Sequence, residues 1–257
     1  MSFELTNRLR KELASLDDVK GRRKTGLFVA EGSKCVLELA ASFKPRYVFA
    51  NAEWIEAHGH DISGVDVAEL KQGQLRELTR LSTTPPVIAC FELPEAAEVP
   101  SKEYFETHLV VALDRIQDPG NLGTILRTCD WMGVDIVLAS RETVDAFNPK
   151  VVQSTMGGLA RTKIVYTDLP QLLSGLGEDV AVYGTFLDGE NIYTADLSLN
   201  GILVMGNEGQ GISADVERYV SKRLLIPSYP GTATVESLNV ATATAIALSQ
   251  FRARTFN

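Results

Sequence analysis

Residues 114–133 combine a tight turn with a helix that carries polar side chains. The run Asp-Pro-Gly-Asn follows an apolar stretch and is typical of a turn, so we expect Asn121 to cap a helix that begins at Leu122. At helical spacing Arg127 then points outward, on the same side as Asp130. A surface ion pair with Asp130 is the simpler interpretation of this segment alone. The alternative is an arginine that acts on a substrate.

A glycine-rich loop is the second segment that suits chemistry. Gly206, Gly209 and Gly211 lie between an apolar run and the helix-like stretch 213–220. Glycines permit positive φ and a close approach of a ligand to the backbone, although a plain connecting turn uses them too. Glu208 is more informative, because a carboxylate in the loop repels phosphate and suits a cationic or hydroxylated partner.

The third segment, residues 226–251, begins where another apolar run ends. A polar loop follows Ile226 and Pro227, and Ser237 and Asn239 then precede a helix rich in alanine and threonine. Both side chains are good helix caps, and capping is the simplest interpretation of these two residues taken alone.

Short apolar runs position all three segments. They occupy residues 109–113, 135–139, 163–167, 180–186, 201–206 and 223–227, and helix-like stretches separate most of them. Near-continuous apolar strands that alternate with helices favour an α/β fold with a mostly parallel sheet covered on both faces. Each chemistry-bearing segment therefore follows a strand.

The first 92 residues form a separate α/β pattern. Helical spacing covers residues 3–16, 33–42 and 69–81, whereas 46–51 and 86–93 are strand-like. Residues 93–104 hold two prolines among glutamates and show no apolar periodicity, which suits a linker. We therefore predict an accessory domain at 1–92, a linker at 93–104 and a second domain at 105–257.

Charge is distributed unevenly along the chain. The net charge of −8 argues against a protein that coats nucleic acid without specificity. Residues 1–46 nevertheless carry a net charge of +4, which leaves −12 on the remainder. The basic cluster at 20–24 either engages phosphates or is a solvated loop, and charge alone favours neither.

Cysteine and histidine spacing argues against a metal site. The three cysteines are widely separated, and no histidine has a partner at zinc-site spacing. No apolar run approaches the ~18 residues that a membrane span needs, and the N-terminus lacks an apolar signal core. These features predict a cytoplasmic protein with neither a metal nor a membrane partner.

Together the three segments resemble the signature motifs of the SpoU (TrmH-type) family of RNA 2′-O-ribose methyltransferases, in the SPOUT superfamily. The residues that carry the resemblance are Asn121, Gly123 and Arg127, then Gly206, Glu208, Gly209 and Gly211, then Ile226, Pro227, Ser237, Leu238, Asn239 and Val240. More loosely, residues 20–32 and 81–91 resemble the accessory substrate-binding domain of many members.

The resemblance implies an α/β protein with a C-terminal trefoil-knotted SPOUT domain that forms a homodimer, and a smaller N-terminal domain like ribosomal protein L30e. It implies transfer of a methyl group from S-adenosylmethionine to a ribose 2′-hydroxyl in structured RNA. The accessory domain favours ribosomal RNA over transfer RNA. The alternatives are a tRNA 2′-O-methyltransferase and an inactive RNA-binding protein of ribosome assembly. A Rossmann-type enzyme is disfavoured because no G-x-G-x-x-G follows an early strand.

The resemblance also implies site residues. The catalytic set is Arg127, Asn121, Glu208, Ser237 and Asn239, the cofactor residues are Gly206, Gly209, Gly211, Ile226 and Leu238, and the basic cluster assigns RNA contacts to Arg22, Arg23 and Lys24. Arg127 would activate the ribose hydroxyl, although an arginine with a pKa above ~12 needs a partner such as the substrate phosphate to act as a base. Asn121 and Glu208 would hold Arg127 and the loops, and Ser237 and Asn239 would align the ribose.

Two features depart from the family pattern. Ser228 follows Pro227, where methionine is usual, and the loop at 228–236 is several residues longer. Both affect the cofactor pocket rather than the reaction.

Overall fold

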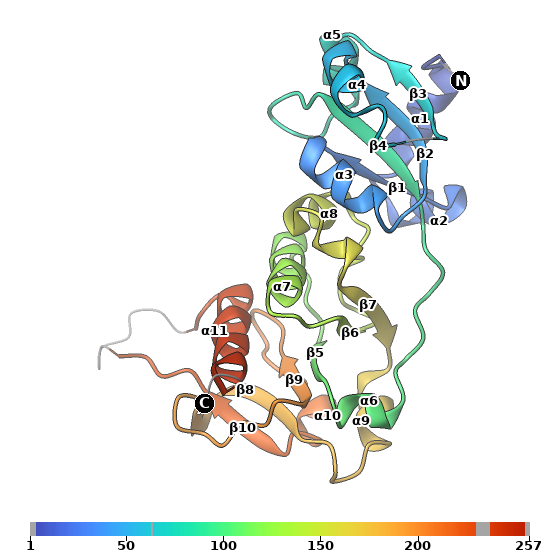
Figure 1. Ribbon diagram of the computed structural model, residues 1–257. Coiled ribbons are helices and arrows are strands. Elements are labelled where there is room, and N and C mark those ends of the chain that lie inside the picture. The colour runs from blue at the N-terminus through green and yellow to red at the C-terminus, as the bar shows by residue number, and fades with distance from the viewer. Residues whose placement is uncertain (1–3, 63, 230–236, 255–257) are drawn as a thin grey trace. The chain divides into compact units, whose positions relative to one another are not determined.

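A computed structural model of the protein describes residues 4–62, 64–229 and 237–254 (Figure 1). The chain divides into two compact units, Met1–Glu95 with Asp145–Arg161, and Ala96–Val144 with Thr162–Asn257. The division into 1–92, 93–104 and 105–257 stays a prediction. The contacts add one feature to it, since Asp145–Arg161 packs within the first unit.

The first unit is built on a four-stranded mixed sheet in the order β1-β4-β2-β3. Its strands are β1 (Leu27–Glu31), β2 (Pro45–Ala50), β3 (Asp66–Glu69) and β4 (Val87–Glu92). β4 is antiparallel to both β1 and β2, and β3 runs parallel to β2. The helices are α1 (Asn7–Ser15), α2 (Val19–Thr25), α3 (Ser33–Ala40), α4 (Ala52–His58) and α5 (Gln72–Leu78). The helices expected near 3–16, 33–42 and 69–81, and the strands at 46–51 and 86–93, are present.

Two apolar groups hold this unit together. Leucines of α1 pack with residues of the sheet, because their four-residue spacing places them on one helix face. A second group is aromatic and includes Phe147 of the 145–161 segment, whose ring centroid lies 4.9 Å from that of Phe28. The same segment forms α8 (Pro149–Thr155) and the 3₁₀ turn η1 (Gly158–Ala160).

Helix α2 differs from the sequence-based expectation. The basic cluster at 20–24, for which the sequence allowed a solvated loop, lies within this helix. A Cβ atom at Gly21 would lie 1.8 Å from the carbonyl oxygen of Ser15, so only glycine lets the two segments approach this closely. Gly21 is therefore required by packing inside the fold.

The second unit contains a six-stranded sheet in the order β10-β8-β9-β5-β6-β7, and all five of its pairings are parallel. The strands are β5 (Leu109–Leu113), β6 (Ile136–Ser140), β7 (Lys163–Thr167), β8 (Val182–Asn191), β9 (Gly201–Met205) and β10 (Lys222–Leu225). Its helices are α6 (Lys102–Phe105), α7 (Pro119–Trp131), α9 (Leu169–Ser174), α10 (Ala214–Glu217) and α11 (Val240–Ala253), and α11 packs on α7. The predicted α/β fold with a mostly parallel sheet is confirmed.

The cysteines are buried thiols. Burial raises the pKa of both Cys35 and Cys90 to about 12, and it also raises the pKa of Cys129. None of the helices in the described ranges is long and apolar enough to cross a membrane. The described residues also contain no cluster of three or more His, Cys, Asp or Glu that could hold a metal ion.

Candidate active site

The three chemistry-bearing segments leave the same edge of the parallel sheet. The first follows β5, the second follows β9, which pairs with β5, and the third follows β10. Parallel strands carry their carboxyl ends at one edge, so the loops that follow them gather there. The topology thus places distant parts of the sequence at one edge.

Helix α7 begins three residues earlier than predicted. Asp118 is the N-cap, and its side chain accepts a hydrogen bond from the backbone nitrogen of Asn121 at 2.8 Å. Pro119 occupies the first helical position, where a missing N–H costs nothing. The prediction that Asn121 caps the helix is wrong, because the aspartate ahead of the proline does so. The Asn121 side chain is therefore free to bind other residues.

Asn121 joins all three segments through its side chain. Its Nδ2 donates to Oε1 of Glu208 at 2.9 Å, and its Oδ1 accepts from Nδ2 of Asn239 at 2.9 Å. Asn239 is also the N-cap of α11, since its Oδ1 accepts from the backbone nitrogens of Ala241 and Thr242 at 2.9 and 3.3 Å. Capping and network formation thus use different atoms of Asn239, and the simple capping interpretation is only half of its role.

The glycine loop is folded around Asn207. Oδ1 of Asn207 accepts from the backbone nitrogens of Gly209 and Gln210, both at 3.0 Å. Two backbone hydrogen bonds also join Asn207 to Gly211. Nδ2 of Asn207 donates to the carbonyl oxygen of Arg115 at 2.8 Å, which ties the loop to the first segment.

Sequence reasoning missed this second connection between the loops. Arg115 has a φ of +59°, which is uncommon for a residue with a side chain. Its backbone nitrogen donates to Oγ of Ser140 at 3.0 Å, and its Nη1 donates to Oε1 of Gln210 at 3.3 Å. Buried Asp114 accepts from the backbone nitrogen of Ser213 at 2.6 Å. The available signal was the Asp-Arg pair at the end of β5, beside the turn already singled out.

The three loop glycines differ in what surrounds them. A Cβ atom at Gly206 would lie 2.3 Å from the backbone of Gly211 and Ile212, so the loop's own packing requires glycine there. A Cβ atom at Gly209 would meet only Asn207 Oδ1 at 3.8 Å, and one at Gly211 would meet nothing within 4 Å. The backbone is therefore open to a ligand at Gly209 and Gly211 but closed at Gly206.

Arg127 stands apart from the network. It is exposed on α7, and its guanidinium makes no hydrogen bond or ion pair with any residue in the described ranges. The surface ion pair with Asp130 is thus not formed. Ser237 and Leu238 are exposed ahead of α11, and Ile226 is half-buried after β10. Hydrogen bonds join Asn121, Glu208 and Asn239, whereas neither Arg127 nor Ser237 is hydrogen-bonded to any of these three.

The basic cluster of the first unit splits into two kinds of residue. Arg22 is 2% exposed, and its guanidinium donates to the carbonyl oxygens of Leu16 and Asp17 and to Oδ2 of Asp145. Arg22 is therefore unavailable to RNA, and its prediction as a phosphate contact is wrong, because the donors that would bind phosphate are used inside the fold. Arg23 and Lys24 are exposed. Residues 230–236 of the longer loop lie outside the described residues.

Comparison with known proteins decides the family. The profile of the SpoU rRNA methylase family matches residues 108–249, and an MRM3-like substrate binding domain matches residues 7–89. The chain belongs to the SpoU rRNA methylase family. This SpoU-family protein is 31% identical over 244 residues to the 23S rRNA (guanosine(2553)-2′-O)-methyltransferase RlmP of Bacillus subtilis, an alignment that covers 94% of this chain and 95% of the relative.

Solved structures agree with this assignment over the whole length of the SpoU-family chain. A TrmH-family protein from Porphyromonas gingivalis has 37% identity and a TM-score of 0.87, covering 98% of this chain and 100% of the other. The AdoMet-bound rRNA methyltransferase of Sinorhizobium meliloti has 30% identity and a TM-score of 0.84, covering 99% and 98%. The family resemblance seen in the three segments is confirmed.

Proposed function

We propose that this protein transfers a methyl group from S-adenosylmethionine to a ribose 2′-hydroxyl of ribosomal RNA. The observation that carries the proposal is the contact of Asn121 with Glu208 and Asn239, which joins the three family segments at one sheet edge. The relatives support the reaction, since the Bacillus subtilis protein is named as a 23S rRNA 2′-O-methyltransferase and the Sinorhizobium meliloti structure holds AdoMet.

The glycine loop fits the proposed cofactor. S-adenosylmethionine supplies the methyl group on a positively charged sulfonium. The open backbone at Gly209 and Gly211 can accept an adenosine at close range, with Ile226 and Leu238 supplying apolar contact. The cofactor carries no phosphate, so the Glu208 carboxylate does not repel it. The same carboxylate would repel the phosphates of a nucleoside triphosphate.

Arg127 activates the ribose in this proposal. Methyl transfer is an in-line displacement that needs an aligned 2′-oxygen and an acceptor for its proton. Arg127 stays protonated, so it holds the ribose and a neighbouring phosphate oxygen, and that phosphate oxygen receives the proton. The exposed guanidinium, with its donors unused by the described residues, suits this contact.

The other site residues act by positioning. Asn121 fixes Glu208 and Asn239, and through them the glycine loop and the start of α11. Ser237 lies two residues before the cap and is exposed, so its hydroxyl can reach the ribose. Arg23 and Lys24 of the first unit contact phosphates of the RNA.

A homodimer and a trefoil knot complete the proposal. Trp131 ends the helix that carries Arg127 and is 86% exposed, which makes it the contact residue that we assign to the homodimer. A second copy of the chain would cover it. Sedimentation of the wild type and of Trp131→Asp tests the dimer, because a charge there should release monomers. An RNA substrate in ribosomes agrees with the cytoplasmic location expected from the sequence.

The reaction is tested by mapping 2′-O-methyl groups in total RNA from cells with and without this gene. Loss of one methylated ribose in ribosomal RNA is expected, and purified protein should restore it on an unmodified transcript. If the missing methyl group is in transfer RNA instead, the substrate is transfer RNA and not ribosomal RNA. An unchanged methylation map, together with no transfer in vitro, would favour the inactive RNA-binding alternative.

A further inference from the structure

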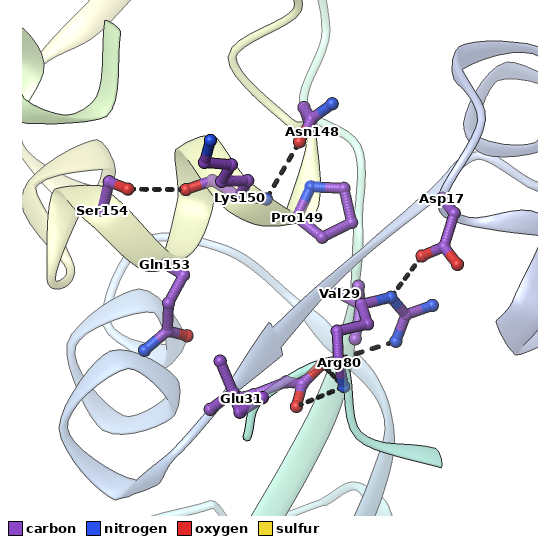
Figure 2. Close-up of a pocket in the computed structure, with 10 residues that line it drawn as sticks. Asp17, Val29, Glu31, Arg80, Asn148, Pro149, Lys150, Gln153 and Ser154 are labelled. Carbon is purple, nitrogen blue, oxygen red and sulfur yellow. Dashed lines mark hydrogen bonds and ion pairs between the residues drawn. The ribbon is translucent and has the colours of Figure 1, made fainter. Parts of the chain in front are cut away.

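A pocket of about 400 Å³ lies within the first unit, and none of the proposed catalytic, cofactor or phosphate-binding residues lines it (Figure 2). Asn148, Pro149 and Gln153 line it from α8 and the loop before it, and Glu31 and Arg80 line it from the side of the sheet. Its volume falls in the range of small-molecule sites, about 300–1,000 Å³. The pocket has no role in the proposed reaction.

Arg80 is held in one orientation by contacts at its edges. Nε donates to Asp17, Nη2 donates to the carbonyl oxygen of Leu13 at 2.8 Å, and Nη1 contacts Oε1 of Glu31 at 3.5 Å. A guanidinium donates only in its own plane, so these partners leave its flat faces for stacking. Glu31 is 4% exposed and is itself held by the hydroxyl of Thr79 and the backbone of Arg80.

Two amides of the pocket have unused hydrogen-bonding atoms. The side chain of Gln153 is half-buried and has no hydrogen-bond partner within the part of the chain that the structure describes. Asn148 accepts from the backbone nitrogen of Lys150 through Oδ1, which leaves its Nδ2 as a donor. The pocket thus offers two donors and an acceptor above an apolar wall that includes Val29, Leu81 and Pro149.

The charges of the lining cancel. Asp17 and Glu31 are negative, whereas Arg80 and Lys150 are positive. A bare phosphate gains little in such a place, because two carboxylates repel it. A neutral, planar ligand with donors and acceptors on its rim gains stacking on Arg80 and hydrogen bonds to Gln153 and Asn148.

We propose that this pocket takes one unstacked nucleobase of the RNA substrate and contributes to the choice of site. Proteins that read single-stranded RNA stack exposed bases on aromatic or arginine planes and bind their edges with polar side chains. The proposal rests on the proposed function, because it presupposes that RNA is the substrate. Phosphate contacts carry no information about base identity, and this pocket would supply that information.

The test uses the full-length protein and labelled RNA octanucleotides that are abasic except for one central adenine, guanine, cytosine or uracil, with a fully abasic strand as reference. Fluorescence anisotropy gives the affinity ratio between each base-bearing strand and the abasic one. Base stacking of this kind adds about tenfold to affinity. We expect at least one base to bind about tenfold more tightly than the abasic strand.

Two substitutions connect that ratio to the pocket. Gln153→Leu keeps the size but loses the hydrogen bonds, so the ratio should fall, while stacking on Arg80 keeps it above one. Gln153→Glu keeps the shape but offers acceptors alone, so the preference should move toward bases that present donors. Gln72→Leu is the matched control, an exposed glutamine of the same unit outside the pocket, and should behave as wild type. Thermal melts of each variant confirm folding.

A ratio near one for all four bases in the wild type overturns the proposal, as does an unchanged ratio in both Gln153 variants. Equal weakening of every strand, the abasic one included, would show that the pocket binds the phosphate backbone and would also overturn it. Methyl transfer by the wild-type protein is measured separately on a ribosomal RNA transcript. Transfer without base discrimination therefore rejects the pocket alone, and discrimination without transfer rejects the proposed enzyme alone.

Discussion

Asn121 gives one hydrogen bond and receives another, and the two bonds reach the loops of the other two family segments. An amide can donate to the carboxylate of Glu208 while it accepts from Asn239, whereas an ionised carboxylate can only accept. A carboxylate at position 121 would face Glu208 with no proton between them. The direction of each bond is therefore fixed by residue type, and exchanging types across the pair tests it.

We expect Asn121→Asp to destabilise the protein by about 0.5–1.5 kcal/mol and to weaken cofactor binding, because two acceptors then meet at a solvent-exposed contact. Adding Glu208→Gln should restore both, since the new amide donates to Asp at 121, which still accepts from Asn239. Thermal melts and calorimetry with S-adenosylmethionine measure the two effects. Glu208→Gln alone is the control and should stay near wild type. A double variant as unstable as Asn121→Asp would show that this network does not form in solution.

Substitution of Arg127 tests whether this arginine has a structural or a functional role. Arg127→Ala should fold and bind cofactor normally but lose methyl transfer by ~10² or more, as loss of proton-transfer assistance typically does. Lysine should not replace it, because a point charge lacks the planar set of donors. Single-turnover transfer of labelled methyl measures the loss. Arg218→Ala is the control, an exposed arginine paired with Asp215, and should keep full activity. Near-normal turnover of Arg127→Ala would reject the proposed mechanism.

Residue types predicted part of this site from the sequence. Asn121, Glu208 and Asn239 follow strands of one parallel sheet, which was readable from the apolar runs, and they do meet. The roles of Asn207 and Arg115 were not readable, since a hydrogen bond from Asn207 to a backbone carbonyl 92 positions away depends on tertiary structure alone. Arg22 was misassigned for the same reason, because charge in a sequence does not reveal burial.

At the scale of elements, the glycine loop contains two kinds of glycine. Gly206→Ala places a methyl group against the backbone of Gly211 and Ile212, and we expect about 1–3 kcal/mol of destabilisation. The methyl group of Gly209→Ala meets only Asn207 Oδ1, at an ordinary van der Waals distance of 3.8 Å, so stability should stay within about 0.5 kcal/mol of wild type. Its methyl group should nevertheless weaken binding of S-adenosylmethionine if the cofactor approaches this backbone. Calorimetry decides, and wild-type affinity in a folded Gly209→Ala protein would move the cofactor away from this position.

Helix α2 is held by one buried guanidinium. Arg22→Ala leaves Asp145 and two backbone carbonyls without their donor, so we expect a loss of about 2 kcal/mol or more from the stability of the first unit. Arg23→Ala, at the next position on the exposed side, should change stability by less than about 0.5 kcal/mol. Denaturant unfolding compares the two. Equal stability of both variants would mean that the contact with Asp145 contributes nothing.

Elements were predictable where one face or a whole strand is apolar. The run at 109–113 coincides with β5, which is buried along its whole length, because a buried parallel strand needs continuous apolar residues. The run at 163–167 coincides with β7 at the end of the sheet, where only Val165 is fully buried. Helix α2 was not predictable from the sequence, since four of the five residues from 20 to 24 are basic and the fifth is a glycine required by packing. The association of Asp145–Arg161 with the first unit rests on contacts such as Phe147 with Phe28, which no local pattern records.

For the whole molecule, charge distribution determines how an acidic protein binds an acidic polymer. The net charge is −8, so attraction to RNA must come from a local surface rather than from the overall field. The basic cluster of the first unit provides this surface. Because Arg22 is buried, the exposed basic residues of the cluster are Lys20, Arg23 and Lys24. The expected phosphate contacts are correspondingly few.

Charge reversal at Arg23 and Lys24 should therefore weaken binding to a ribosomal RNA transcript and flatten its salt dependence. Each lost phosphate contact lowers the slope of log K against log salt by about 0.7–0.9, so two contacts should lower it by about 1.5. The control reverses Lys163 and Arg218, exposed residues of the second unit, and changes the net charge equally. Filter binding across a salt series gives both slopes, and affinity for S-adenosylmethionine should stay constant. Equal slopes for the two double variants would mean that net charge, rather than a contact at Arg23 and Lys24, controls RNA binding. A wild-type slope in the Arg23 and Lys24 double variant would place the phosphate contacts on another face of the first unit.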